Sequence, residues 1–150
     1  MGLSVRDDPP KIIDLSLYTF GEPREGLALA VRQIPRADPD ALSTVSVVIR
    51  NISDQPKSFV TPGWLAFYRL NVQLPDGTPV APTPFGRALS NPARQQESLR
   101  ATLAPGAFNE TEIPLGSLFN MRPRAVYAVQ ARCQPLDGVT VESNRIDLLV

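Results

Sequence analysis

The stretch MRPRAVYAVQARC, residues 121–133, decides the fold of this chain. Within it, the apolar residues Tyr127, Val129 and Ala131 alternate with polar ones such as Gln130. A period of two is the signature of a β-strand with one face in the core and the other toward water. The stretch therefore predicts a half-buried strand.

The residues around Tyr127 indicate how this strand begins. Pro123 fixes φ and cannot donate to a ladder, so it belongs before the strand. A tyrosine just inside such a strand can bury its ring and return its hydroxyl to nearby backbone, which is the tyrosine corner of Greek-key sandwiches. Met121, Pro123, Tyr127 and Val129 resemble the Leu-x-Pro-x-x-x-Tyr-x-Val pattern of fibronectin type III and other immunoglobulin-like domains, with Met for Leu. The alternative is an edge hairpin with a buried tyrosine.

Similar alternation, with turn residues between the segments, recurs along the chain. Other strands are predicted at 11–20, 26–33, 41–51, 58–61, 64–74, 98–103, 108–115 and 139–150, with 64–74 the longest. Turns are predicted at 21–26, 51–56, 75–77, 103–106 and 134–138. One core is predicted from Val45, Val47, Ile49, Leu70, Val72, Tyr127, Val129, Ile146 and Leu148, with Ser46 and Arg50 pointing outward. The expected fold is all-β, an immunoglobulin-like two-sheet Greek-key sandwich of about 7–9 strands.

The order of the turns is also similar to that of the bacterial intracellular proteinase inhibitor family, over residues 41–131. The matching elements are NIS at 51–53, Pro56, Phe59, PDG at 75–77, LAPG at 103–106 and Tyr127. Two positions depart from the family pattern: Ala107 stands where these domains often carry Glu, and Ala125 where they often carry Gly. The resemblance therefore implies the fold more than it implies inhibition of a proteinase.

Length and composition restrict the class of protein. The 150 residues suit one domain at 11–150, preceded by a flexible, proline-rich lead at 1–10. Lys plus Arg and Asp plus Glu are fifteen each, so no electrostatic footprint for nucleic acid is expected. No apolar run is long enough to predict membrane insertion, and no signal peptide is evident. The single cysteine, Cys133, is expected to be a small buried hydrophobe.

The composition also argues against catalysis. Without histidine there is no Ser-His-Asp triad or Cys-His pair, and one cysteine cannot build a structural zinc site. We expect no catalytic residue, no metal and no cofactor. Glu110 and Glu112 share one strand face, where they can hold a hard cation, act as an acid–base pair or simply form a solvated outer face. The last interpretation is favoured.

Binding is therefore the expected function, with another protein as the partner. The stretch 81–100 has no clear element, and long loops in compact domains tend to be functional or disordered. Phe85, Arg87 and Arg94 are the candidate binding residues within it, and Asn91 before Pro92 is typical of a helix start, although a mobile loop fits equally. The first hypothesis is an interaction or spacer module of a larger exported or surface protein. The second is a proteinase-inhibitor-like or carbohydrate-binding sandwich that acts through the loops 51–63 and 81–100. An exposed Trp64, with Phe85 nearby, would favour it. The oligomeric state has no sequence signal.

Overall fold

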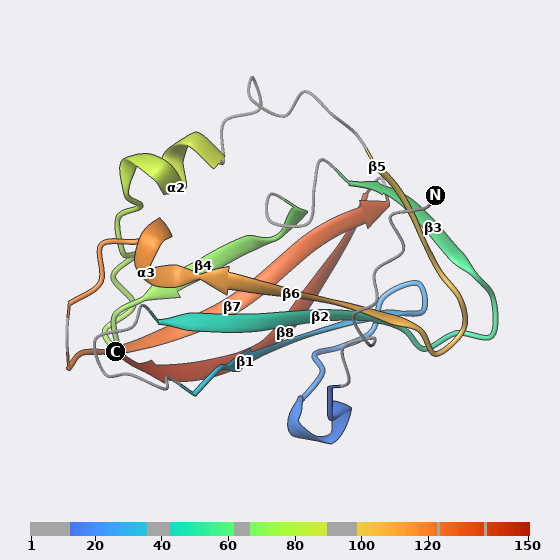
Figure 1. Ribbon diagram of the computed structural model, residues 1–150, viewed down its shortest axis with the longest axis horizontal. Helices are drawn as coiled ribbons and strands as arrows, with labels where there is room; N and C mark the ends of the chain where they lie inside the picture. The colour runs from blue at the N-terminus through green and yellow to red at the C-terminus, as the bar shows by residue number, and fades with distance from the viewer. Residues whose placement is uncertain (1–12, 36–42, 62–66, 90–98, 123, 137) are drawn as a thin grey trace, which may run out of the picture.

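The computed structural model describes residues 13–35, 43–61, 67–89, 99–122, 124–136 and 138–150. Those residues form eight β-strands and three short helices (Figure 1). The elements in chain order are η1 (Leu15–Leu17), β1 (Leu27–Gln33), β2 (Thr44–Asn51), β3 (Lys57–Thr61), β4 (Arg69–Gln73), α2 (Pro84–Leu89), β5 (Leu99–Leu103), β6 (Phe108–Pro114), α3 (Leu115–Leu118), β7 (Val126–Leu136) and β8 (Val139–Leu149). The predicted all-β character is confirmed, and the predicted lead at 1–10 lies outside the described residues.

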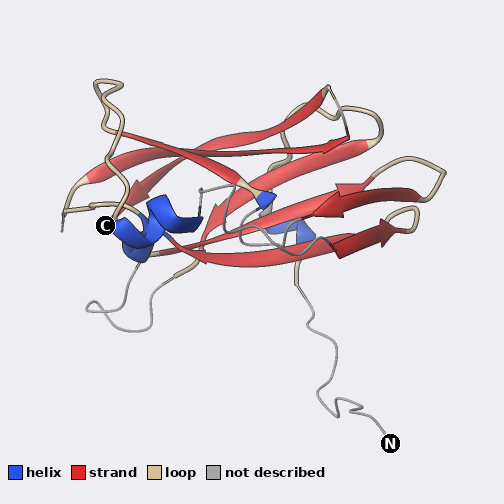
Figure 2. Cartoon of the chain, turned by 90° about the horizontal axis from the view of Figure 1, so that it is seen from above, coloured by secondary structure: helices blue, strands red, loops and turns tan. Residues whose placement is uncertain are grey.

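The strands pair in three antiparallel sheets, ordered β1-β2-β6, β3-β5 and β4-β7-β8. Register follows the apolar alternation: Leu29 lies opposite Ile49, and Val72 lies opposite Val129. Figure 2 shows the helices outside the body of strands, with two of them at the end that carries the C-terminus. The helices therefore lie at one end and on one face of a fold that is made of strands.

One hydrophobic core receives side chains from all eight strands and from α3. The predicted core is confirmed: seven of its nine residues are buried within this cluster, and Leu70 and Ile146 are partly buried against it. Phe59, predicted to point inward, is buried and stacks on Phe67 with ring centroids 5.4 Å apart. Cys133 is buried as expected.

A bulge in β8 joins two of the sheets. Ser143 and Asn144 together lie opposite Ala131 of β7, and the Ser143 hydroxyl accepts the Ala131 N–H at 2.8 Å. The extra residue lets Asn144 turn its amide toward β1. There its Oδ1 accepts the N–H of Val31 at 2.9 Å, and its Nδ2 donates to the Val31 carbonyl at 3.2 Å. Because one side chain satisfies both backbone groups of Val31, the outer edge of β1 is closed at this point.

The strand predicted at 11–20 is wrong over its described residues. Residues 15–17 form the 3₁₀-helix η1 instead. Asp14 explains the change, because its carboxylate accepts the backbone N–H of Ser16 at 3.0 Å and its carbonyl accepts that of Leu17 at 3.1 Å. Aspartate competes for local backbone groups in this way, and here that competition prevails over the alternation of apolar residues.

The segment around η1 covers the outer face of the β1-β2-β6 sheet. Tyr18 packs there on Ala30 and Val48 in a second, smaller apolar cluster. This cover corrects the prediction that Ser46 faces solvent: Ser46 points away from the main core but is buried beneath Tyr18. Arg50, also predicted outward, is half-buried. The alternation of β2 is correct, but its second face is covered as well.

Three further boundaries differ from the predictions. The strand predicted at 64–74 is shorter, because β4 begins at Arg69 and ends at Gln73. Phe67 is helical, and residues 64–66 lie outside the described residues. The longest strands among the described residues are therefore β7 and β8, with 11 residues each, and not the predicted strand 64–74. β7 also continues through most of the predicted turn 134–138. Leu115, expected to close a strand, begins α3.

Candidate functional site

The short helix α2 lies in the stretch that the sequence left undefined. Thr83 caps it: the Thr83 carbonyl accepts the N–H of Arg87 at 2.9 Å, and its hydroxyl accepts that of Gly86 at 3.1 Å. Pro84 follows at the first helical position, where its missing N–H costs nothing. The helix start predicted at Asn91 lies outside the described residues, and the helix at 84–89 was not predicted. Thr83-Pro84 carries the same start signal as Asn91-Pro92.

α2 is fixed against α3 and the chain that follows it. The Thr83 hydroxyl donates to the Ser117 carbonyl at 2.6 Å, and the Thr83 N–H donates to the Leu118 carbonyl at 2.9 Å. Gly86 packs so closely that a Cβ atom there would lie 2.2 Å from the Leu118 carbonyl oxygen. Any larger residue at 86 must therefore displace the helix. These contacts make α2 a positioned element.

The described binding candidates stand on this helix. Phe85 is 51% exposed. Arg87 is exposed too, with its Nη1 donating to the Pro82 carbonyl at 3.0 Å. The other two candidates, Arg94 and Trp64, lie outside the described residues. Aromatic side chains and arginines are both enriched at protein interfaces, and α2 presents one of each.

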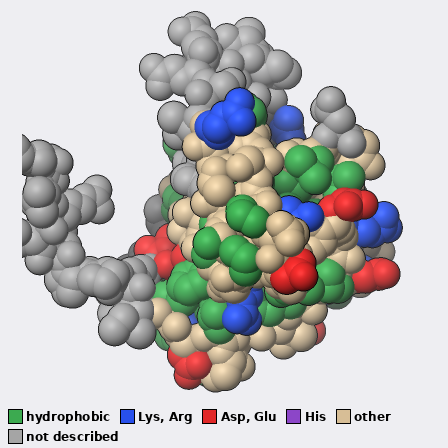
Figure 3. Space-filling model, turned by 90° about the vertical axis from the view of Figure 1, so that its right-hand side faces the viewer, with side chains coloured by type: hydrophobic (Ala, Val, Ile, Leu, Met, Phe, Trp, Pro, Cys, Tyr) green, Lys and Arg blue, Asp and Glu red, His purple; other side chains and the backbone are tan. Residues whose placement is uncertain are grey.

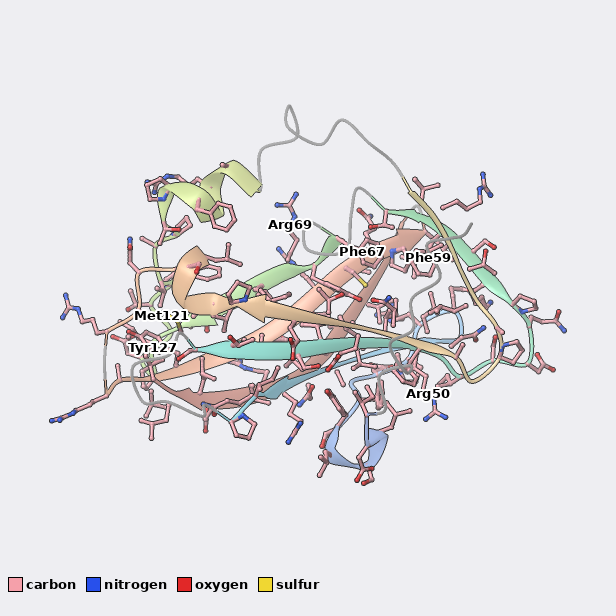
Figure 4. All side chains as sticks on the ribbon, in the orientation of Figure 1. Arg50, Phe59, Phe67, Arg69, Met121 and Tyr127 are labelled. Carbon is pink, nitrogen blue, oxygen red and sulfur yellow. The ribbon has the colours of Figure 1, made fainter. Side chains whose placement is uncertain are left out.

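The loop between α3 and β7 is held in place by hydrogen bonds from its own backbone N–H groups. The Arg122 N–H donates to the Tyr127 hydroxyl at 2.7 Å, as the tyrosine-corner hypothesis requires of a nearby backbone group. The Arg124 N–H donates to the oxygen of Val150 at 2.6 Å. Figure 4 labels Met121 and Tyr127 at this end of the molecule. We call the surface formed by Phe85, Arg87, Arg122, Arg124, Val126 and Leu149 the α2 end.

The sequence analysis missed four residues of the α2 end. Arg122 and Arg124 are exposed, and Val126 and Leu149 are exposed apolar residues that lie opposite each other across β7 and β8. A sequence signal for the arginines does exist, because no Asp or Glu occurs between Glu112 and Asp137. A signal for Leu149 also exists, because the predicted inward position of Leu148 places its neighbour on the outer face of the strand.

A second candidate is an open pocket of about 280 Å³ above the face covered by η1. At its base, the Ser46 hydroxyl donates to Glu110 Oε2 at 2.6 Å and lies 2.7 Å from the Tyr18 hydroxyl. Glu110 and Glu112 both line it, which confirms their shared face. The solvated-face interpretation is correct for the exposed Glu112 but wrong for Glu110, which is partly buried. Carboxylates, one guanidinium and aliphatic side chains line the pocket together, so it selects no single class of ligand.

Two titratable groups of the core, Cys133 and Tyr68, have raised pKa values. Burial raises the pKa of the Cys133 thiol to about 12. Burial, and next the neighbouring Cys133, raise the pKa of Tyr68 well above its ordinary value. Both groups are therefore protonated at neutral pH. A protonated, buried thiol is a poor nucleophile, so Cys133 acts as a core residue.

The described part of the chain contains neither a membrane-spanning helix nor a cluster of metal-binding side chains. Among those residues, no helix has the length and apolar character needed to cross a membrane. No group of three or more His, Cys, Asp or Glu side chains within the same ranges is arranged to hold a metal ion. The chain matches no protein-family model, and no curated protein is significantly similar to it.

Proposed function

We propose that this chain is a non-catalytic protein-binding module that contacts its partner through the α2 end. The observation that carries the proposal is Phe85, a large aromatic side chain held half-exposed on a helix that the fold positions. Full burial of a phenylalanine side chain contributes roughly 1.5–3 kcal/mol, and about half of that is forgone while half of Phe85 stays in water. That free energy is recovered when a partner covers the ring.

The proposed fold is an immunoglobulin-like two-layer sandwich. In its support, the β1-β2-β6 and β4-β7-β8 sheets contribute to one core. The buried Tyr127 also returns its hydroxyl to the backbone at the start of β7, as a tyrosine corner does. Such domains place loops and short helices at the ends of a rigid body, and this is where they commonly bind. The α2 end has that position.

The chemistry of the described side chains supports binding over catalysis. Glu110 is tied to Ser46 and Tyr18, and the thiol of Cys133 is buried and protonated. Neither group has the accessible, activated arrangement of a nucleophile or a general base. The proposal therefore excludes turnover of peptide, ester or glycoside substrates by this chain.

The test is a selection of displayed random peptides on the full chain, with binders rescreened against Phe85→Ala. We expect a set of peptides that lose about tenfold or more in affinity on this substitution, as truncation of an aromatic anchor does. The matched control is Val60→Ala. Val60 is 54% exposed but lies on β3, away from the α2 end, so its truncation is expected to leave these peptides bound.

Phe85→Leu is a second variant that keeps an apolar side chain in the helix. It is expected to retain part of the affinity, which shows that the fold persists and that the ring itself matters. Selected binders that are indifferent to both Phe85 substitutions would contradict the proposed function.

A further inference from the structure

Two stretches of this sequence contain arginine but no acidic residue. Residues 77–96 include Arg87 and Arg94, and residues 113–136 include Arg122, Arg124 and Arg132. The chain as a whole has no net charge, so these stretches are locally basic and acidic residues are concentrated elsewhere. Along the chain the two stretches are separated by β5 and most of β6.

The fold brings the two acid-free stretches together. Pro82 forms a β-bridge with Phe119, and the Asn120 N–H donates to the Ala81 carbonyl at 2.9 Å. With the contacts of Thr83 to Ser117 and Leu118, they place α2 directly beside the loop that carries Arg122 and Arg124. Figure 1 shows α2, α3 and the C-terminus at the same end of the molecule.

Three exposed guanidinium groups thereby share the α2 end. Within the described residues, neither Arg122 nor Arg124 forms an ion pair. Two acids are nearby. The carboxylate of Asp76, in the turn after β4, accepts the backbone N–H of Thr78 at 2.9 Å, and Asp147 is exposed on β8 two residues before Leu149. Figure 3 looks onto the opposite end, where acidic and basic side chains are interspersed. The basic character therefore belongs to one end.

Arg124 adopts a backbone conformation that does not suit an arginine. Its φ is 62°, in the left-handed region where glycine is unstrained and other residues are not. The Arg124 contact to Val150 uses the backbone N–H, which glycine also has. The fold thus does not require the side chain of Arg124. A strained residue whose side chain does nothing for the fold is a reason to look for a function of that side chain.

Resting on the proposed function above, we propose that the α2 end docks an acidic protein segment that carries an apolar side chain. The apolar side chain covers Phe85, and the neighbouring carboxylates face Arg87, Arg122 and Arg124. Guanidinium groups at the rim of an apolar anchor favour carboxylate partners by steering and by paired hydrogen bonds. Three arginines are fewer than the roughly 6–10 phosphate contacts of a nucleic-acid site.

The peptides selected in the Phe85 experiment provide the test. We expect those that depend on Phe85 to be enriched in Asp and Glu over the unselected library, and to weaken as salt rises from about 50 to about 300 mM. The double variant Arg122→Gln, Arg124→Gly is expected to weaken them about three- to tenfold, as loss of two rim charges does. The matched control is Arg145→Gln, an exposed arginine of β8 outside the α2 end, with a change under about twofold.

The outcomes separate this inference from the proposed function. Phe85-dependent peptides without acidic enrichment, or with equal losses for Arg145→Gln, overturn the acidic partner and leave the binding module in place. Tighter arginine-dependent binding of single-stranded DNA or of phosphatidylserine vesicles also overturns it, in favour of another anionic occupant. A selection that yields no Phe85-dependent peptide contradicts the proposed function itself.

Discussion

The hydroxyl of Tyr127 accepts a hydrogen bond from the backbone N–H of Arg122 at 2.7 Å, across five residues of chain. The ring of Tyr127 is buried in the core, so this bond ties the loop that carries Arg122 to a buried residue near the start of β7. The tyrosine therefore contributes both to the core and to the position of the α2 end.

Removing the Tyr127 hydroxyl tests this relationship. We expect Tyr127→Phe to lower the free energy of unfolding by about 1 kcal/mol or more, because the Arg122 N–H loses its partner. Tyr127→Ala is expected to cost about 3–5 kcal/mol, the range for large aromatic truncations in cores. Urea denaturation of both variants provides the measurement. A neutral Tyr127→Phe would remove the support for a tyrosine corner.

Asn144 offers a test of how β1 and β8 are joined. Asn144→Ala leaves both backbone groups of Val31 without their side-chain partners in a buried place, and we expect a loss of about 2 kcal/mol or more. Asn71→Ala, at an exposed position of β4, is the control and is expected to stay within about 0.5 kcal/mol of the parent. Equal effects of the two substitutions in chemical denaturation would show that the amide bridge is dispensable.

Gly86 links the packing of α2 to binding. Gly86→Ala is expected to cost about 1–3 kcal/mol, because its Cβ must displace the helix from the Leu118 carbonyl. The same displacement moves Phe85, so affinity for Phe85-dependent peptides is expected to fall as well. Gly77→Ala is the control: with φ at 91° and nothing within 4 Å, it strains the backbone but leaves α2 in place. Stability and affinity that fall together in both variants would argue against a positional role.

Alkaline pH should destabilise the protein through Cys133. Its pKa is about 12 in the folded state, above the ordinary value of 9.0, so the folded state binds the proton more tightly. The contribution is complete below about pH 9 and is lost as pH rises toward the folded pKa. By pH 10 the loss is expected to be on the order of 1 kcal/mol. Urea denaturation at pH 8 and 10 should show it for the parent chain, and Cys133→Ala should show only the smaller loss that the raised pKa of Tyr68 causes. A Cys133→Ala protein with the same pH dependence would assign the loss to other groups.

The sequence alone was sufficient to predict the strands whose two faces carry different types of residue. β1, the inward residues of β2 and the buried positions of β7 and β8 follow from period-two alternation, because one face of each meets the same core. Turns at 75–77 and 103–106 also follow, since Gly77 and Gly106 adopt positive φ as glycine allows. The inward placement of Phe59 and Cys133 belongs to the same group.

Local competition and tertiary cover account for the predictions that were wrong. At 13–20 the alternation was present, but the Asp14 carboxylate took the N–H that a ladder needs. At Ser46 the polar residue did point away from the main core, but a segment from elsewhere in the chain covered it. Whether the second face of a strand is solvated depends on the segment that packs on it, and the sequence of the strand alone does not identify that segment.

The candidate site depends most on tertiary structure. Phe85 and Arg87 were identified from the sequence, while Arg122 and Arg124 were not. Both acid-free stretches are visible in the sequence, yet their meeting at Pro82 and Phe119 is not. Alternation and turn chemistry act between residues close along the chain, so the sequence determined strands and turns. Contacts between distant segments require the assembled core, and only those contacts bring three exposed arginines and one exposed ring to the same end of the molecule.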